Sequence, residues 1–227
     1  MPTAHEEVLA DLGPRIVDGL LAPGDALTLD AIRADYEVSR TVAREVVQVL
    51  ASMGLVESRR RTGVTVLPEE RWDHYAPSVI RWRLAGPGRG RLLHQLAQLR
   101  AAVEPTSAAL SAVHATPETR RRLLRLADEL ERTGAGGDLQ AFLELDVTFH
   151  RLLLDGTGNP MFRALGDVVE EVLRGRTDHD LMPSEPAPEA RRLHAEVARA
   201  VAAGEAEAAR AAMHAICVEV VGQLRPD

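Results

Sequence analysis

A long run of helical periodicity in the second half of the chain places the strongest constraint on its fold. From Leu92 to Leu224, apolar residues recur every three or four positions, and glycine or proline residues punctuate the run. This spacing puts the apolar side chains of each segment on one helical face, which must be buried against another helix. The pattern predicts a bundle of six antiparallel helices with an interior that can hold a site. The expected helices are residues 89–114, 117–133, 138–156, 160–176, 187–203 and 205–225.

The first third of the chain has shorter segments and different turn signals. Helical spacing covers residues 6–21 and 29–36, and a third helix begins at Ser39, a natural N-cap, and ends at Gly54. Two short strands follow, at 55–58 and 64–67, joined by a basic turn. Three short helices and a basic-tipped hairpin are typical of a winged helix-turn-helix. In that fold the third helix enters the major groove of DNA, and the hairpin reaches phosphates or the minor groove.

The charge distribution agrees with this interpretation. The whole chain has a net charge of −7, so contact with nucleic acid must come from a local patch. Residues 33–63 carry six arginines and four acidic residues, whereas residues 1–32 are acidic. All 27 basic residues are arginine, which indicates a compositional bias, so arginine content alone does not imply phosphate binding. With 3% aromatic residues, stacking on single-stranded nucleic acid is not expected. The alternative is a small helical domain with a solvated arginine face.

Proline and glycine residues mark a boundary between residues 68 and 90. Within it, residues 78–84 form a short amphipathic piece, and Trp72 and Trp82 are expected to pack on a neighbouring domain. We expect a winged helix-turn-helix domain at 1–68, a linker with one short helix at 69–88 and a helical effector-binding and dimerisation domain at 89–227. The single cysteine, Cys217, excludes an internal disulfide. No apolar run reaches the roughly 20 residues of a membrane span, and the N-terminus lacks a signal peptide pattern, so we expect a cytoplasmic protein with no membrane partner.

Asp146 and His150 are the residues of the helical region that first indicate a binding site. Four residues apart on one expected helix, they point in nearly the same direction, beside its apolar stripe. His194 and His214 lie on two later helices. Carboxylate and imidazole groups together suit a divalent cation such as zinc, nickel or manganese. Alone, the Asp146–His150 spacing is weak evidence, because such pairs are common on helix surfaces.

The N-terminal motifs resemble the DNA-binding domain of the GntR family of bacterial transcription regulators. They read IVDGLLAPGD, VSRTVAREVVQVLASMGLVE and RRRTGVTV, within about residues 6–67. The resemblance implies DNA contacts from the third helix and the wing, at Ser39, Arg40, Thr41, Arg44, Arg60, Arg61 and Gly63. Asp30 departs from the pattern, since many relatives carry a basic residue there. Arg33 could supply the missing phosphate contact from one turn further on.

Residues 90–220 resemble the all-helical FCD effector domain of the FadR branch of that family, in the stretches LAQLRAAVEPTSAALSA, LDVTFHRLLLDGTGNPMF and LHAEVARAVAAGEAEAARAAM. The resemblance implies that Asp146, His150 and His194 bind one metal. The family's fourth ligand position falls on Ile216, two residues beyond His214. Three alternatives follow: a three-ligand site completed by water or by an effector carboxylate, a metal-free polar pocket, or a shifted helix that brings His214 inward.

Arg100 matches an arginine that approaches the effector's carboxylate in relatives of this family. A guanidinium group suits two-point binding of a carboxylate, although an exposed arginine or an Arg100–Glu104 helix pair is the plainer alternative. The linker SVIRWRLAG resembles those of regulators of sugar-acid catabolism. These features imply a small carboxylate effector, with a sugar acid as one form of it.

The sequence therefore favours a mainly α protein that regulates transcription in response to a ligand, in the manner of a repressor. A homodimer would bind a double-stranded, roughly palindromic operator. One alternative is a metal-dependent enzyme that uses Asp146, His150 and His194 to activate water. The sequence shows no evident general base, nucleophile or phosphate-binding loop, so we do not expect this protein to be an enzyme. Another is a helical scaffold without a DNA role, which leaves the basic third helix and wing unexplained.

Overall fold

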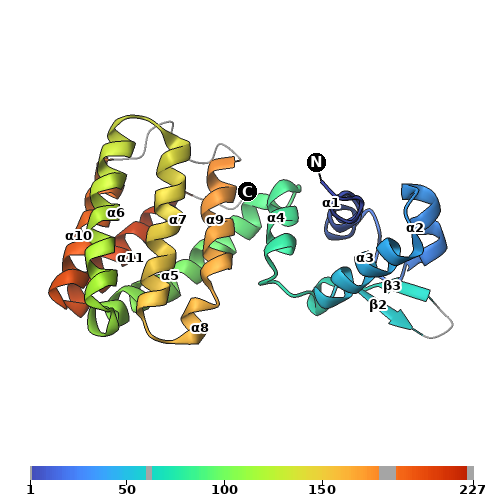
Figure 1. Ribbon diagram of the computed structural model, residues 1–227, viewed down its shortest axis with the longest axis horizontal. Helices are drawn as coiled ribbons and strands as arrows, with labels where there is room; N and C mark the ends of the chain where they lie inside the picture. Colours follow the sequence, from blue (N-terminus) through green and yellow to red (C-terminus); the bar gives the residue numbers. More distant parts are fainter. Residues whose placement is uncertain (1, 60–62, 179–187, 224–227) are drawn as a thin grey trace. The chain divides into compact units, whose positions relative to one another are not determined.

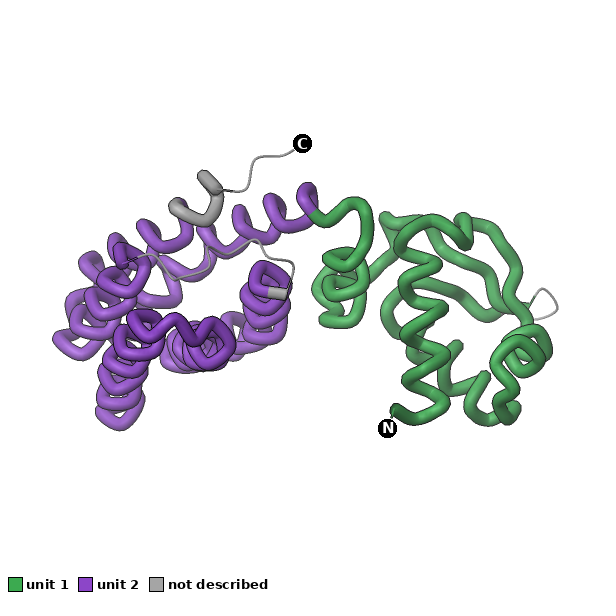
Figure 2. Tube along the Cα trace, turned by 90° about the horizontal axis from the view of Figure 1, so that it is seen from above, with its two compact units in different colours: residues 1–89 green, residues 90–227 purple. Residues whose placement is uncertain are grey.

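The computed structural model describes residues 2–59, 63–178 and 188–223, and the chain divides into two compact units, residues 1–89 and 90–227 (Figures 1 and 2). The first unit combines short helices with a small sheet, and the second is helical throughout its described part. The elements of the first unit are α1 (Ala4–Val17), β1 (Ala26–Leu27), α2 (Leu29–Tyr36), α3 (Arg40–Ser52), β2 (Val56–Arg59), β3 (Gly63–Val66), a 3-10 turn (Glu69–Arg71) and α4 (Pro77–Ala85).

Polar caps start the three helices of the expected winged helix-turn-helix. The hydroxyls of Thr3, Thr28 and Ser39 each accept a hydrogen bond from the first turn of the helix that follows. These caps satisfy backbone N–H groups that have no partner inside the helix. Glu37 ends α2 in the left-handed conformation, at a φ of 53°, which turns the chain sharply into α3. A shared core then fixes the three helices against the sheet. Its fully buried large members include Ile16, Leu50 and Leu55.

The sheet has three antiparallel strands in the order β1-β3-β2. The sequence pattern predicted the β2–β3 hairpin but not β1, whose two residues are too few to show an alternating pattern. In β1, Ala26 pairs with Thr65 and Leu27 with Val64, so the loop before α2 is tied to the wing. Gly63 begins β3 at a φ of 83°, a conformation that favours glycine.

Helix α4 and both tryptophans pack within the first unit. The indole N–H of Trp72 donates to the carbonyl oxygen of Leu67 at 3.1 Å. The ring of Trp82 covers Gly13 of α1, where no side chain would fit. Val79 of α4 belongs to the same buried core as α1 and α3. Much of the segment expected to act as a linker therefore packs against α1 and the core of the first unit.

The second unit contains seven helices among its described residues. They are α5 (Arg89–His114), α6 (Pro117–Ala135), α7 (Leu139–Gly156), α8 (Pro160–Arg163), α9 (Gly166–Asp178), α10 (Pro188–Ala203) and α11 (Ala206–Gln223). The prediction of a single helix at 160–176 is thus wrong, because α8 ends and α9 begins around Leu165. There the N–H of Leu165 bonds to the carbonyl of Phe162 in a tight turn, and Gly166 follows. Apolar residues continue through the turn, so periodicity alone could not reveal the break.

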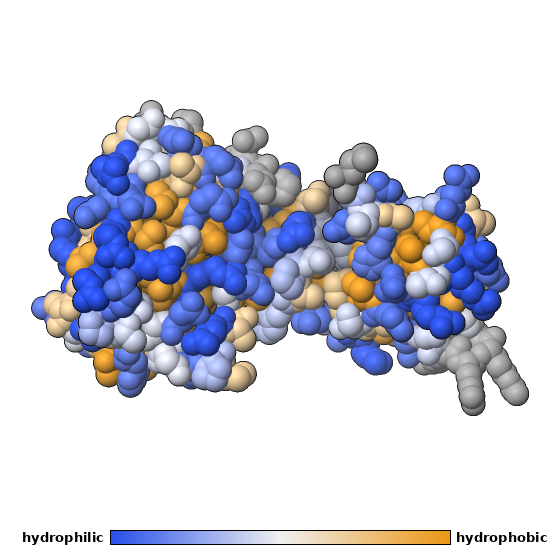
Figure 3. Space-filling view, viewed as in Figure 1, coloured by the Kyte–Doolittle hydropathy of each residue, from blue (hydrophilic) through white to orange (hydrophobic). Residues whose placement is uncertain are grey.

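Helices α5, α6, α7, α10 and α11 share the main core of this unit, and α9 packs on α7 through a second cluster. On the face seen in Figure 3, apolar side chains gather between α6 and α7, bordered by hydrophilic ones. Partly buried Leu124, Leu145 and Leu152 from these two helices pack against the main core.

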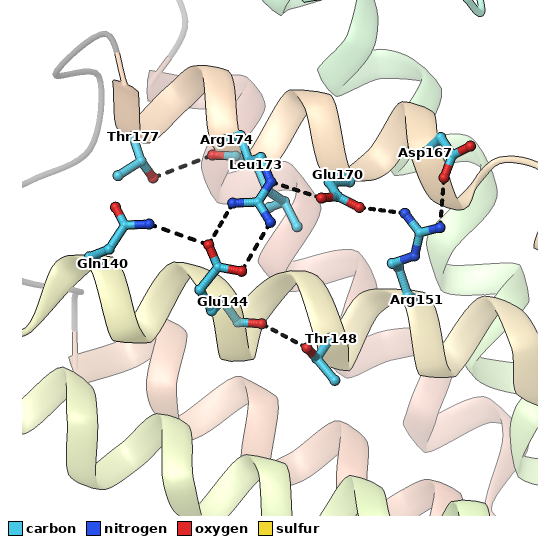
Figure 4. A network of polar contacts seen from close by, with 9 residues as sticks. All are labelled: Gln140, Glu144, Thr148, Arg151, Asp167, Glu170, Leu173, Arg174 and Thr177. Atoms are coloured by element: carbon cyan, nitrogen blue, oxygen red, sulfur yellow. Dashed lines mark hydrogen bonds and ion pairs between the residues drawn. The ribbon is translucent and has the colours of Figure 1, made fainter. Parts of the chain in front are cut away.

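A chain of ion pairs joins α7 to α9 along their exposed edges (Figure 4). Arg174 contacts both carboxylate oxygens of Glu144, at 2.6 and 3.0 Å, and Glu170 at 2.8 Å. Arg151 contacts Glu170 at 2.5 Å and Asp167 at 2.6 Å. The hydrogen bonds from Arg174 lower the pKa of Glu144. This network holds the outer face of α7 while its inner face carries the polar cluster described next. None of the described helices is long and apolar enough to cross a bilayer.

Candidate functional site

Asp146, His150 and His194 meet in the interior of the second unit, as the sequence predicted. Asp146 and His150 lie one turn apart on α7, and His194 comes from α10. His194 Nε2 is 2.9 Å from Asp146 Oδ1, and His150 Nε2 is 3.3 Å from the same oxygen. The two imidazole rings stand edge to face, 5.6 Å apart, and Phe149 packs edge-on against both. All three polar residues are buried.

The arrangement fits a divalent metal ion. One donor atom from each residue lies within 4.8 Å of the other two. Donors about 2.0–2.2 Å from one shared ion would be roughly 3.0–3.5 Å apart. The two Nε2 atoms lie 2.9 and 3.3 Å from Asp146 Oδ1, close to that range. Asp146 Oδ1 and both Nε2 atoms are buried without a well-directed hydrogen bond, even though they approach one another. Buried polar atoms rarely lack such partners, so the three atoms have the direction and the chemistry of ligands for a common cation.

The other nitrogen of each imidazole ring faces a specific acceptor. His194 Nδ1 is 2.7 Å from the carbonyl oxygen of Ala190, on its own helix. His150 Nδ1 is 2.5 Å from Glu104 Oε2, across from α5. Both contacts favour a proton on Nδ1 and leave Nε2 free to bind a metal.

Charges within the cluster shift the pKa values of its members strongly. Burial alone would raise the pKa of Asp146, but the charge of His150 and the close approach of both imidazole rings hold it well below its usual value. Burial would lower the pKa of His150, but Glu104 and Asp146 raise it to about 9. Burial also opposes ionisation of Glu104, whose pKa is nevertheless lowered to about 2 by Arg100 and His150. The carboxylates of Asp146 and Glu104 are thus ionised in the interior, where Arg100 and the imidazole rings stabilise their charge.

Arg100, the expected effector-binding residue, lies beside the same cluster. It is 3% exposed, and its Nε and Nη2 atoms contact Glu104 at 2.5 and 3.3 Å. Its third nitrogen, Nη1, is buried and has no hydrogen-bond partner. The helix pair considered from the sequence is therefore present, but it lies in the interior and leaves one donor available to a ligand.

Helix α11 presents Ile216 to the core and His214 to the surface. Ile216 is 6% exposed and belongs to the main core, whereas His214 is exposed. The alternative in which a shifted helix brings His214 inward is therefore not what the structure shows, and His214 does not join the three other residues. Residues two positions apart on a helix point in directions that differ by about 200° around its axis, so His214 and Ile216 face opposite sides.

Glu104 is the residue of this site that the sequence pattern did not reveal. It appeared only as the helix partner of Arg100, and its contact with His150 joins α5 to α7, which spacing within one helix cannot predict. The signal available in the sequence was an i,i+4 pair of opposite charges on α5, on a helix face that continues with two small polar residues, Ser107 and Ser111.

The residues expected to contact DNA are exposed at the start of α3. Arg40, Thr41 and Arg44 all point to solvent. Ser39 caps α3 by accepting a hydrogen bond from the N–H of Val42 at 3.2 Å, so its hydroxyl hydrogen remains able to reach a phosphate. The positive side chains and the helix N-terminus together suit binding to an anionic backbone.

Arg33 and the wing complete the expected DNA face in part. Arg33 pairs with Asp30 at 3.2 Å, and both side chains reach solvent, so the pair is weak and can exchange for a phosphate. Gly63 lies at the base of the wing, where an added Cβ would meet the carbonyl oxygen of Leu27 at 3.2 Å. Arg60 and Arg61 lie outside the described residues.

A winged helix-turn-helix unit together with a helical unit that encloses a polar cluster defines a transcription regulator with separate DNA-binding and effector-binding domains. Comparison with known families agrees: residues 4–66 match the bacterial regulatory proteins of the gntR family, and residues 95–218 match the FCD domain. The chain belongs to the GntR family and carries an FCD domain.

Characterised and uncharacterised relatives are similar along most of their length. The galactonate operon transcriptional repressor of Escherichia coli (strain K12) is 27% identical over 181 residues, 79% of this chain and 78% of that protein. The HTH-type transcriptional regulator LutR of Bacillus subtilis (strain 168) is 29% identical over 204 residues, 87% and 90% of the two chains. Among solved structures, Streptococcus agalactiae GntR aligns with a TM-score of 0.53 and 24% identity, over 96% of this chain and 99% of that one, which supports the fold.

Proposed function

We propose that this regulator is a homodimeric, cytoplasmic repressor whose helical domain senses a small carboxylate at a metal centre. Each protomer would place one α3 helix in a half-site of a roughly palindromic operator. Effector binding would change operator affinity to the extent that the effector prefers one arrangement of the dimer over the other.

The observation that carries the metal centre is the convergence of Asp146 Oδ1 and two Nε2 atoms. These atoms approach within 2.9 and 3.3 Å without hydrogen-bond geometry, while the opposite nitrogen of each ring faces an acceptor. Asp146, His150 and His194 would therefore hold zinc, nickel or manganese. The bound ion would supply a Lewis acid that takes an oxygen of the effector in its remaining positions.

The balance of buried charge supports an anionic effector. A divalent ion and Arg100 are opposed by Asp146 and Glu104, which leaves one positive charge uncompensated when both histidines are neutral. The remaining buried charges among the described residues of this unit, Glu171 and Arg176, cancel each other. A carboxylate would neutralise the excess, and it could contact the metal and the unpartnered Nη1 of Arg100 together.

The names of two relatives support the choice of repressor and of a sugar acid. The galactonate operon repressor and the Exu regulon transcriptional regulator of Escherichia coli (strain K12) are 27% and 28% identical to this chain. A sugar acid offers a carboxylate beside hydroxyl groups, which is a chelating arrangement for a metal with open positions.

Among the described residues, the site offers little support for the alternative of a metal-dependent enzyme. The nearest extra carboxylate, Glu104, is paired with both Arg100 and His150 and is therefore not placed as a free general base. We assign the metal to sensing.

Metal content and DNA binding test the proposal separately. Purified protein should contain close to one zinc, nickel or manganese ion per chain, and His150→Ala should lose it, whereas His214→Ala should keep it because His214 is exposed. Elemental analysis without any of the three metals, together with no thermal shift when each is added, would reject the metal centre.

For DNA, the wild type should bind the sequence flanking its own gene, with an affinity that falls steeply as salt rises. Arg40→Ala/Arg44→Ala should weaken binding at least about tenfold and reduce the slope of log affinity against log salt by roughly 0.9 for each phosphate that the variant no longer neutralises. Arg125→Ala, an exposed arginine of α6, is the matched control and should leave binding unchanged. Equal binding by all three proteins would reject α3 as the recognition helix.

A further inference from the structure

His150 has a second ring nitrogen that faces away from the three-residue cluster. Glu104 Oε2 lies 2.5 Å from that atom, Nδ1. Glu104 comes from α5 and is 2% exposed, whereas His150 comes from α7 and is 1% exposed. Because a buried carboxylate is costly unless it is paired, its placement against this nitrogen is a specific feature of the interior.

Arg100 fixes Glu104 in turn. Arg100 Nε is 2.5 Å from Oε1 of Glu104, and Nη2 is 3.3 Å from Oε2. Contact at two points sets both the position and the rotation of a carboxylate. The carboxylate of Glu104 approaches His150 Nδ1 closely, although the contact lacks the alignment of a good hydrogen bond. Arg100 therefore fixes the position of the Glu104 carboxylate, which acts as an acceptor for His150.

We propose that Glu104 is a positioning residue of the metal centre. It holds the proton of His150 on Nδ1, directs the lone pair of Nε2 toward the metal, and depends on Arg100 as its fixed counterion. This inference rests on the proposed metal function. Histidine ligands whose other N–H faces a carboxylate or carbonyl have a fixed tautomer and a more basic ligand atom.

His194 provides the internal comparison. Its Nδ1 faces the carbonyl oxygen of Ala190 at 2.7 Å, a neutral acceptor on the same helix. Glu104 is charged and belongs to another helix. A carboxylate increases the electron density of the ring more than a carbonyl does, so His150 is the stronger ligand of the two. Two nitrogens of Arg100, Nε and Nη2, contact Glu104, so Nη1 is the nitrogen that can bind an effector.

Zinc titration of the full chain tests this role with two variants of Glu104. Glu104→Gln keeps the size and one acceptor but removes the charge, and Arg100→Leu/Glu104→Leu removes both charges so that neither is left unpaired in the core. Competition with a chromophoric chelator should show zinc affinity about 10–100-fold weaker in both. Ser107→Ala is the matched control, because Ser107 is buried on α5 and bonds only within its own helix, to the carbonyl of Val103. It should bind zinc within about twofold of wild type.

The ring itself supplies a readout that a merely structural role would not change. Imidazole nitrogen chemical shifts of the zinc-loaded wild type should show His150 protonated on Nδ1 and bound through Nε2. Zinc affinities of both Glu104 variants equal to wild type, or zinc bound through Nδ1 of His150, would overturn the inference. A wild type that binds none of the three metals would instead remove the metal centre, so the two failures are distinguishable.

Discussion

The indole ring of Trp82 lies directly on Gly13, and a Cβ added at Gly13 would be 2.5 Å from the nearest ring atoms. The contact lets α4 approach α1 closely within the first unit. Gly13→Ala should therefore force the ring to move and lower the free energy of unfolding by about 1–3 kcal/mol, as overpacking of a core commonly does. Urea denaturation followed by tryptophan fluorescence measures the change.

Gly88→Ala is the control for this substitution. Gly88 has no atom within 4 Å of the added Cβ and does not have a positive φ. The free energy of unfolding of Gly88→Ala should stay within about 0.5 kcal/mol of wild type, as is usual for surface changes. Equal stability of the Gly13→Ala and Gly88→Ala proteins would show that the ring is not held against α1.

Tyr36 of α2 donates its hydroxyl hydrogen to Asp11 of α1, and Arg15 contacts both the Tyr36 hydroxyl and Asp11. Burial first, and then Asp11, raise the pKa of Tyr36 above its usual value of 10.0. Because the folded state prefers the protonated phenol, this contact stabilises the domain fully below about pH 10 and less as pH rises through the higher pKa. In a Tyr75→Phe background, phenolate absorbance reports Tyr36 alone, and adding Asp11→Asn should lower its midpoint. An unchanged midpoint would contradict the link between α1 and α2.

Ile216→His should complete the proposed metal centre. Ile216 is buried in the main core at the position that the family resemblance assigns to a fourth ligand. A histidine there should tighten zinc binding on the order of tenfold or more, because zinc prefers four protein ligands in closed sites. It should also weaken the response to a carboxylate effector, since the histidine would occupy a coordination position. Isothermal titration with zinc, and then with a sugar acid, measures both changes.

His214→Ala serves as the comparison for Ile216→His. Because His214 is exposed, its removal should change zinc affinity by less than about twofold. If His214→Ala weakened zinc binding and Ile216→His did not tighten it, α11 would have to sit differently in solution.

Arg174→Ala should weaken the attachment of α9 to α7. This arginine contacts Glu144 at two points and also Glu170, so the substitution removes the centre of one network (Figure 4). The side chains are partly exposed, so the expected destabilisation is only about 1 kcal/mol, and it should shrink in high salt. Arg121→Ala, which breaks an exposed pair with Glu118, should cost less than about 0.5 kcal/mol. Urea unfolding at two salt concentrations compares them.

Much of this architecture could be predicted from the sequence, because the apolar periodicity is strong and a helix cap depends only on neighbouring residues. The bounds expected for the helix at 89–114 agree with α5, and Ser39 begins α3 as a cap. The winged helix-turn-helix and the helical domain are confirmed by the family matches. Strand β1 and the break between α8 and α9 were missed, because two residues carry no alternation and a tight turn need not interrupt an apolar pattern.

The candidate site was accessible in part for the same reason. Asp146 and His150 share a helix, so their spacing predicted their common direction. The family resemblance predicted that His194 joins them, and in the structure His194 contacts Asp146. Glu104 depends on how α5 lies against α7, which is a tertiary contact that no local pattern encodes.

The polar cluster draws Glu104 from α5, His150 from α7 and His194 from α10, so its parts are far apart in the order of synthesis. A growing chain therefore cannot acquire the cluster until α10 has been made and has packed on the earlier helices. Any ion held there would bind only a finished domain, and metal supply would then govern how much regulator survives proteolysis as well as how it responds.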